Sequence, residues 1–135
     1  TGVTQQVGNL AITLTPNSAS SKFLLLSSFV VGHENYGSQM TFMRGSTDLS
    51  VALAVSPSNR TPGFFSAYAQ QADFTTSGNM TFIDSPNTSS AITYKVGTHV
   101  REGGNTWSFN TNRNNQDTND HASGVSTFAV LELGV

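Results

Sequence analysis

Three histidines, His33, His99 and His121, are the side chains of this sequence best suited to move protons near neutral pH. None of them lies in a motif that would place a nucleophile beside an imidazole, and the G-x-S-x-G nucleophile elbow is absent. His99 falls on the polar face of an expected strand, whereas His33 and His121 fall in expected loops. We therefore interpret all three as surface residues.

The eight acidic residues are the second source of catalytic groups. A glycoside hydrolase needs two carboxylates at a defined separation in space, and the sequence alone does not give that separation. A carbohydrate-active enzyme therefore stays open as the most distant alternative. We expect a protein that is not an enzyme, with no catalytic residues and no cofactor.

The run at residues 115–120 resembles the first half of a calcium-binding loop, because its side chains offer oxygen atoms at alternate positions. The second half departs from the pattern. Asp120 stands where the loop glycine is needed, and Ser126 stands where the bidentate glutamate is needed. We interpret the segment as a solvated turn without a metal, and calcium binding by the loop 112–121 stays an open alternative.

Several expected loops carry groups suited to molecular recognition. Tyr36 follows an apolar strand, Arg60 stands between two prolines, and Arg113 and Asp117 lie in the polar run 112–121. Tyrosine offers contact area at a small entropic cost and arginine offers planar donors, and loops on a rigid sheet scaffold commonly bind partners. These four residues are the candidate binding residues, and ordinary turns are the alternative.

Composition excludes several classes of partner. The net charge is −2 and the six basic residues are scattered singly, so no basic stripe is present to follow nucleic acid or an anionic membrane. The sequence has no cysteine, which excludes disulfides, zinc–thiolate sites and thiol nucleophiles. With 18 Ser, 17 Thr and 12 Asn but only 10% charged residues, the surface must be wetted by hydroxyls and amides.

Alternation with a period of two predicts strands along most of the chain, and turn-forming residues separate them. The expected strands and strand-like segments are residues 10–14, 23–31, 39–44, 49–55, 64–71, 80–84, 91–101, 107–109 and 125–135. No run of helix formers is long enough for three turns. About eight to nine short strands predict an all-β fold, an antiparallel β-sandwich or jelly-roll-like domain.

The segment 23–31 is apolar on both faces. Phe23, Leu25, Phe29 and Val31 point one way, and the other face is formed by Leu24, Leu26 and Val30. An outer sandwich strand usually has one polar face, so the second face must lie under another layer or against a neighbouring subunit. We expect Leu24, Leu26 and Val30 to form an oligomer or core face.

Two further expectations concern strand pairing. Gly103 and Gly104 predict a two-residue hairpin that sets Val100 opposite Trp107, with Tyr94 and Trp107 packed in the core. The last strand is expected to place Val125, Ala129, Leu131, Leu133 and Val135 inward, with Ser126 and Glu132 outward. The chain is one domain, residues 1–135, and because it starts at Thr1 we expect it to be the C-terminal part of a longer chain.

Four segments together resemble a family of tailed-phage virion proteins common in marine and cyanobacterial phages. They are LAITLTPNSASSKFLL at residues 10–25, MRGST at 43–47, FIDSPNTSSAITYKV at 82–96 and STFAVLELG at 126–134. The resemblance spans most of the chain, is one of pattern, and carries over no functional residue. It implies a β-sandwich module on the virion surface, most often a homotrimer in contact with other virion proteins.

Composition and resemblance together lead to one hypothesis with one close rival. The leading hypothesis is a tail-fibre receptor-binding domain whose loops contact a glycan or protein on the host cell. The rival is a capsid decoration protein, which would bind the assembled capsid through a base surface and stabilise it.

Overall fold

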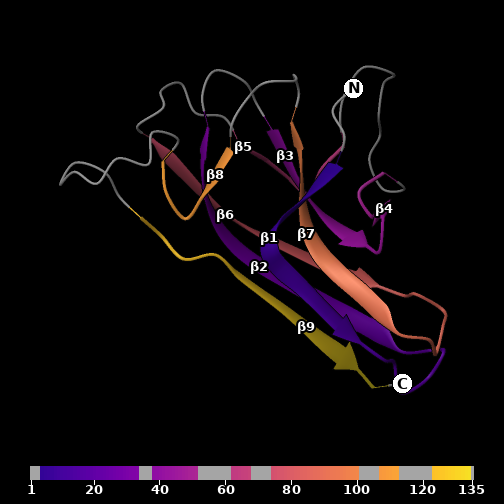
Figure 1. Ribbon diagram of the computed structural model, residues 1–135. Coiled ribbons are helices and arrows are strands. Elements are labelled where there is room, and N and C mark those ends of the chain that lie inside the picture. Colours follow the sequence, from indigo (N-terminus) through magenta and orange to yellow (C-terminus); the bar gives the residue numbers. More distant parts are fainter. Residues whose placement is uncertain are drawn as a thin grey trace.

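Nine strands make up the regular structure of the computed structural model, which describes residues 4–33, 38–51, 62–67, 74–100, 107–112 and 123–134. Figure 1 shows their arrangement. The strands are β1 (Thr4–Leu14), β2 (Lys22–His33), β3 (Ser38–Arg44), β4 (Thr47–Asp48), β5 (Phe65–Ala67), β6 (Thr75–Asp84), β7 (Ile92–Val100), β8 (Trp107–Phe109) and β9 (Thr127–Leu133). Within these ranges no helix is present, and therefore none that could cross a membrane.

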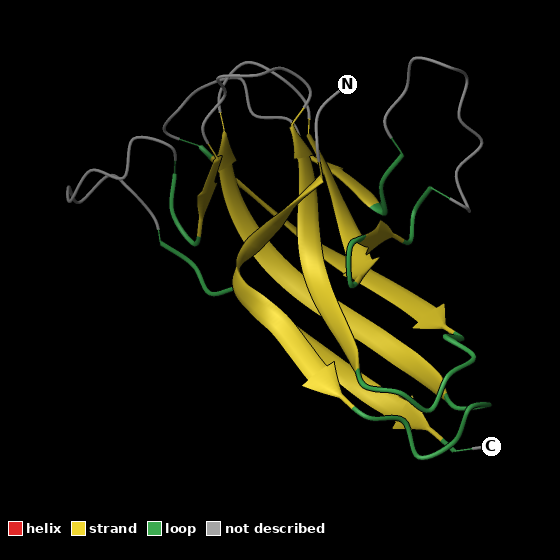
Figure 2. Cartoon of the chain, turned by 45° about the vertical axis from the view of Figure 1, so that its right-hand side comes forward, coloured by secondary structure: helices red, strands yellow, loops and turns green. Residues whose placement is uncertain are grey.

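The strands form two antiparallel sheets, which confirms the predicted β-sandwich (Figure 2). One sheet has the order β1-β7-β3-β4, with β5 also paired to β3. The other has β2 at its centre. β6 occupies one edge of β2, and β8 and β9 share the other edge, β8 beside Val31–His33 and β9 beside residues 22–28.

The core lies between the sheets and consists of side chains that alternate along the central strands. On β2, Phe23, Leu25, Phe29 and Val31 are fully buried. Opposite them lie buried residues of β3 and β7: Met40, Phe42, Tyr94 and Val96. Burial of this apolar area is the main source of stability, at about 25 cal/mol per Å². The predicted inward phase of β2 and of Tyr94 therefore matches the packing.

The predicted β7–β8 hairpin is wrong. Trp107 pairs with His33 and Phe109 pairs with Val31, so β8 belongs to the sheet of β2 and not to that of β7. Glycines favour a tight turn, but they do not determine which edge the following strand joins. Beyond Ser28 the edge of β2 is free of β9, and β8 completes it there.

The predicted phase of the last strand is also wrong. Phe128 and Val130 pack against the core, and the ring of Phe128 stacks on Phe42 at a centroid distance of 5.9 Å. Ala129 and Leu131 point away from the core and are exposed. Because β9 is apolar on both faces, alternation alone allows either set of side chains to point inward. The set that contains the aromatic ring of Phe128 fills the core.

Strand boundaries differ from the prediction elsewhere as well: β1 begins at Thr4 rather than at residue 10, and the short strand β4 lies where a turn was predicted. β6 begins at Thr75 rather than at Met80. A turn occupies residues 49–51 where a strand was predicted, and the remainder of 49–55 lies outside the described residues. The predicted strand 64–71 contains β5, and its last residues are also outside the described part.

Candidate functional site

The four candidate binding residues belong to chain segments that join one end of the sandwich. The residues themselves lie outside the described part of the chain: Tyr36, Arg60, Arg113 and Asp117. The flanking strand ends are described. His33, the last residue of β2, pairs with Trp107, and Ser38, the first residue of β3, pairs with Val100. The segment of Tyr36 therefore connects strand ends that lie together.

The segments of the other candidates return to the same end. The amide of Phe64, shortly after Arg60, donates to the carbonyl of Met40 near the start of β3. Gly124 donates to Asn110, whose own amide donates to Val30 near the end of β2. We call this end, where β2 ends and β3 begins, the loop end. In Figure 1, β5 and β8 lie at it and the C-terminus lies at the other end.

Large apolar side chains are exposed on the face of the β6-β2-β9 sheet that points away from the core. We call it the outer face and define it by nine residues in three rows across the strands. The rows are Ile83, Leu24 and Leu131; then Thr81, Leu26 and Ala129; then Asn79, Ser28 and Thr127. Ile83 is 52% exposed, Leu131 46% and Leu26 36%. Contiguous exposed apolar side chains of this size mark interaction surfaces more often than isolated ones do.

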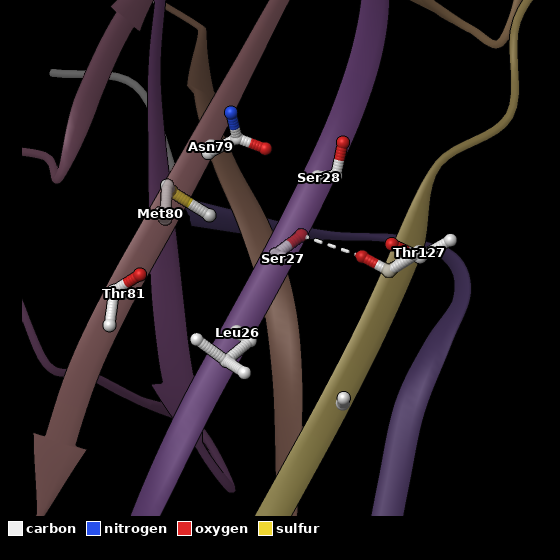
Figure 3. A pocket seen from close by; sticks show the side chains of 8 residues that line it. Leu26, Ser27, Ser28, Asn79, Met80, Thr81 and Thr127 are labelled. Carbon is white, nitrogen blue, oxygen red and sulfur yellow. Dashed lines mark hydrogen bonds between the residues drawn. The ribbon is translucent and has the colours of Figure 1, made fainter.

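A shallow hollow of about 430 Å³ lies on the outer face, next to the row of large apolar side chains. Figure 3 shows Leu26 at one side of it and Ser28, Asn79 and Thr127 around it. The Ser27 hydroxyl donates a 3.0 Å hydrogen bond to the Thr127 carbonyl and links β2 to β9 at this level. The hollow exists because short polar side chains follow long apolar ones along the strands.

The three residues predicted for an oligomer or core face have different surroundings. Leu24 and Leu26 belong to the outer face. Val30 lies on the same side of β2, but Gly124 of the same chain packs on it, since a Cβ on that glycine would lie 2.6 Å from a Val30 methyl carbon. The chain itself therefore contacts Val30, and the outer face ends before it.

A buried polar cluster joins the two sheets near the opposite end of the sandwich. Asp84 on β6 accepts hydrogen bonds from Nη1 of Arg44, at 3.1 and 2.9 Å, and from the Tyr94 hydroxyl, at 2.6 Å. Burial, followed by the hydrogen bond to Asp84, raises the pKa of the Tyr94 phenol. The cluster satisfies a buried carboxylate, so its role is structural.

A second polar cluster surrounds Asp48. Its carboxylate accepts hydrogen bonds from the hydroxyls of Thr41 (2.5 Å) and Ser50 (2.7 Å) and from the Ser50 amide (2.8 Å), and it lies 2.7 Å from Nε2 of His99. Burial by itself raises the pKa of Asp48, but the hydrogen bonds from Thr41, Ser50 and His99 outweigh it, and the pKa lies below its ordinary value.

The Asp48 cluster corrects the interpretation of His99 as a surface residue, because its side chain is only 12% exposed. The cluster contains serine, aspartate and histidine, yet the Ser50 hydroxyl donates to Asp48 rather than to the imidazole. In a nucleophilic triad the imidazole accepts the proton of the nucleophilic hydroxyl. Here the hydroxyl donates to the aspartate, so the three residues do not form such a triad.

Metal ligands do not gather in the described part of the chain: no group of three or more His, Cys, Asp or Glu side chains is placed to hold an ion there. Calcium binding by the loop 112–121 was the open alternative. Residues 113–121 of this loop lie outside the described residues, and Asn112, its first residue, is buried.

The sequence predicts the centre of the outer face, Leu24 and Leu26, but not its two sides. Ile83 is the residue before the last of a mostly polar strand, and only the β2–β6 register places it beside Leu24. The sequence predicts Ala129 and Leu131 on the inward face of β9, and the structure places them on the outer face. The available signal was the aromatic ring at Phe128, which belongs on the inward face of a strand apolar on both sides.

Comparisons with known proteins add no relative. No protein-family model matches the chain, and no curated protein sequence matches it either.

Proposed function

We propose that this chain is a non-enzymatic structural module of a tailed-phage virion surface, displayed as a homotrimer, and that it is the receptor-binding domain of a tail fibre. Its target would be a glycan or a protein of the host cell surface. The observation that carries the proposal is that the segments of the four candidate binding residues all join the loop end of a rigid sandwich. A fixed scaffold with variable connections at one end suits recognition.

The rigidity of the scaffold supports this role. β2 pairs with β6 over ten residues and with β9 over seven, and β3 pairs with β7 over seven. The opposite end is fastened as well: Asn17 donates to Glu132 through its backbone amide (2.8 Å) and through its side chain (2.6 Å). The segments that connect strands at the loop end therefore begin and end at backbone positions that the sheets hold in place.

Three of the eight acidic residues are described by the structure, and the carboxylates of all three are engaged within the chain, so these three are not directed at a sugar. Asp48 and Asp84 accept the hydrogen bonds given above, and Glu132 accepts those from Asn17. A glycoside hydrolase would need an acid and a base or nucleophile directed at a sugar instead.

Localisation on intact virions tests the proposal. Antibodies raised against the purified domain, bound to phage particles that carry the chain and viewed by electron microscopy, are expected to label the tail. Label over the head would identify a capsid decoration protein instead. Absence of the chain from purified particles would overturn both.

Cell binding tests the loop end separately. A fluorescent form of the trimer should bind host cells, and Tyr36→Ala or Arg60→Ala should weaken that binding at least about tenfold, as expected for a tyrosine or arginine that anchors an interface. Thr15→Ala, at an exposed residue beyond the other end of β1, is the matched control and should bind unchanged.

A further inference from the structure

We infer that the outer face is the surface through which three copies of this chain associate, around a three-fold axis that runs along β2. The inference rests on the homotrimer of the proposed function and names the surface that forms it. Three observations carry it: the absence of charge, the order of the side-chain rows, and the width of the face.

The absence of charge favours a copy of the same chain as the occupant. None of the nine residues that define the outer face is ionisable, and Lys22, in the row beyond Leu24, lies at its margin. Copies of one chain bring identical charges to a shared axis, where like charges repel. A face without charge removes this cost, and it offers an acidic or basic partner nothing to pair with.

The rows of side chains would form layers around the axis. Ile83, Leu24 and Leu131 lie side by side, so three copies would bring nine large apolar side chains into one layer. The next layer would be smaller, because Leu26 is flanked by Thr81 and Ala129. β2 is the central strand, so Leu24 and Leu26 would lie nearest the axis.

The width of the face matches a three-fold arrangement. Packed sheets lie about 10 Å apart, so each backbone would lie about 5 Å from the axis, and a triangle with that inner radius has sides of about 17 Å. Three strands spaced about 4.8 Å apart cover about 14 Å. The three strands β6, β2 and β9 therefore span nearly one full side of such a prism.

The area of the outer face is modest. β2 and β9 pair over seven residues, which corresponds to a face about 23 Å long and, in projection, about 330 Å² per copy. Three copies bring together about 1,000 Å² in total, or about 330 Å² for each of the three contacts between neighbouring copies, which is below the size of a specific two-partner interface. We expect dissociation in the micromolar range rather than an obligate trimer.

A single cysteine tests the arrangement, because the chain has none of its own. Leu26→Cys would bring three thiols to the axis. A short bis-maleimide can join only two of them, so denaturing electrophoresis should show two of every three chains as covalent dimers and the third as monomer. The parent protein should sediment as a trimer at concentrations of tens of micromolar.

Ala11→Cys is the matched control, because Ala11 is exposed on β1 in the other sheet. The Ala11→Cys protein should form no more covalent dimer at tens of micromolar than it forms at high dilution, where only chance encounters crosslink. Leu26→Asp should weaken association at least about 100-fold, since three carboxylates would be buried together, while its circular dichroism stays that of the β-sandwich.

The remaining outcomes overturn the inference in recognisable ways. A monomer at tens of micromolar would reject self-association. Conversion of all chains to covalent dimers would show a two-fold contact, and a trimer in which Leu26→Cys does not crosslink would show that another surface forms it. A trimer held by another surface would overturn the inference and leave the proposed function standing, whereas a monomer would also remove the homotrimer from the proposed function. Virion labelling tests the location of the chain separately.

Discussion

The hydroxyl of Tyr94, on β7, donates a 2.6 Å hydrogen bond to Oδ2 of Asp84, on β6, and this buried pair ties one sheet of the sandwich to the other. Arg44 completes the group with an ion pair of 2.9 Å to the same carboxylate. A buried carboxylate is tolerated only when its oxygens are satisfied, so each partner stabilises the position of the other two.

Removal of the Tyr94 hydroxyl should therefore weaken the fold. Tyr94→Phe is expected to lower the free energy of unfolding by about 1–3 kcal/mol, because Asp84 stays buried with one donor fewer. Urea titration at a fixed protein concentration measures this. Thr15→Ala, at an exposed hydroxyl, should change stability by less than about 0.5 kcal/mol. Equal effects of the two changes would contradict a structural role for the pair.

The lowered pKa of Asp48 predicts a loss of stability in acid. A carboxyl whose pKa is lower in the folded state than in the unfolded state contributes stability above the unfolded pKa, near pH 4, and loses it as the pH falls through the folded value. The difference in the free energy of unfolding between the parent and Asp48→Asn should therefore decrease as the pH falls from 5 to 2.5. Urea titrations of both proteins across this range measure the difference, and a difference that does not change with pH would be inconsistent with the hydrogen bonds to Asp48.

Gly78 lies where the core leaves no space for a side chain. A Cβ there would lie 2.7 Å from two ring carbons of Phe65 and 2.9 Å from Phe29. Gly78→Ala should destabilise the fold by about 1–3 kcal/mol through overpacking. Gly134→Ala is the control, because nothing lies within 4 Å of its Cβ position. In thermal unfolding, the midpoint of Gly78→Ala should lie well below that of the parent, and the midpoint of Gly134→Ala should stay close to it. An unchanged midpoint for Gly78→Ala would mean that the rings of Phe65 and Phe29 do not lie against residue 78.

The phase of β9 can be checked with one core variant. Phe128→Ala removes a ring that stacks on Phe42, and the expected loss is about 2–4 kcal/mol, since the ring is only partly buried. Thr127→Ala, one residue earlier and exposed, should have little effect on stability. If Thr127→Ala proved the more damaging of the two in urea titration, the alternating assignment of β9 would have to be reversed.

Local alternation in the sequence determined the fold class and most strands. Phe23, Leu25, Phe29 and Val31 repeat at two-residue steps, and because successive side chains of a strand point to opposite faces, their burial follows from spacing alone. The second apolar face of β2, with Leu24 and Leu26, follows from the same rule. Turn residues such as Pro16 ended the strands where expected.

Only the tertiary structure decided which strands are neighbours and which face of a two-sided strand is inward. β8 joined β2 rather than β7, β9 turned Phe128 to the core, and Asp48 came within 2.7 Å of His99, far away in the sequence. The physical reason is that alternation is a property of a few consecutive residues. Pairing, phase and buried polar contacts are chosen by competition among distant segments for the same edges and the same core volume, and the outer face is a result of that choice.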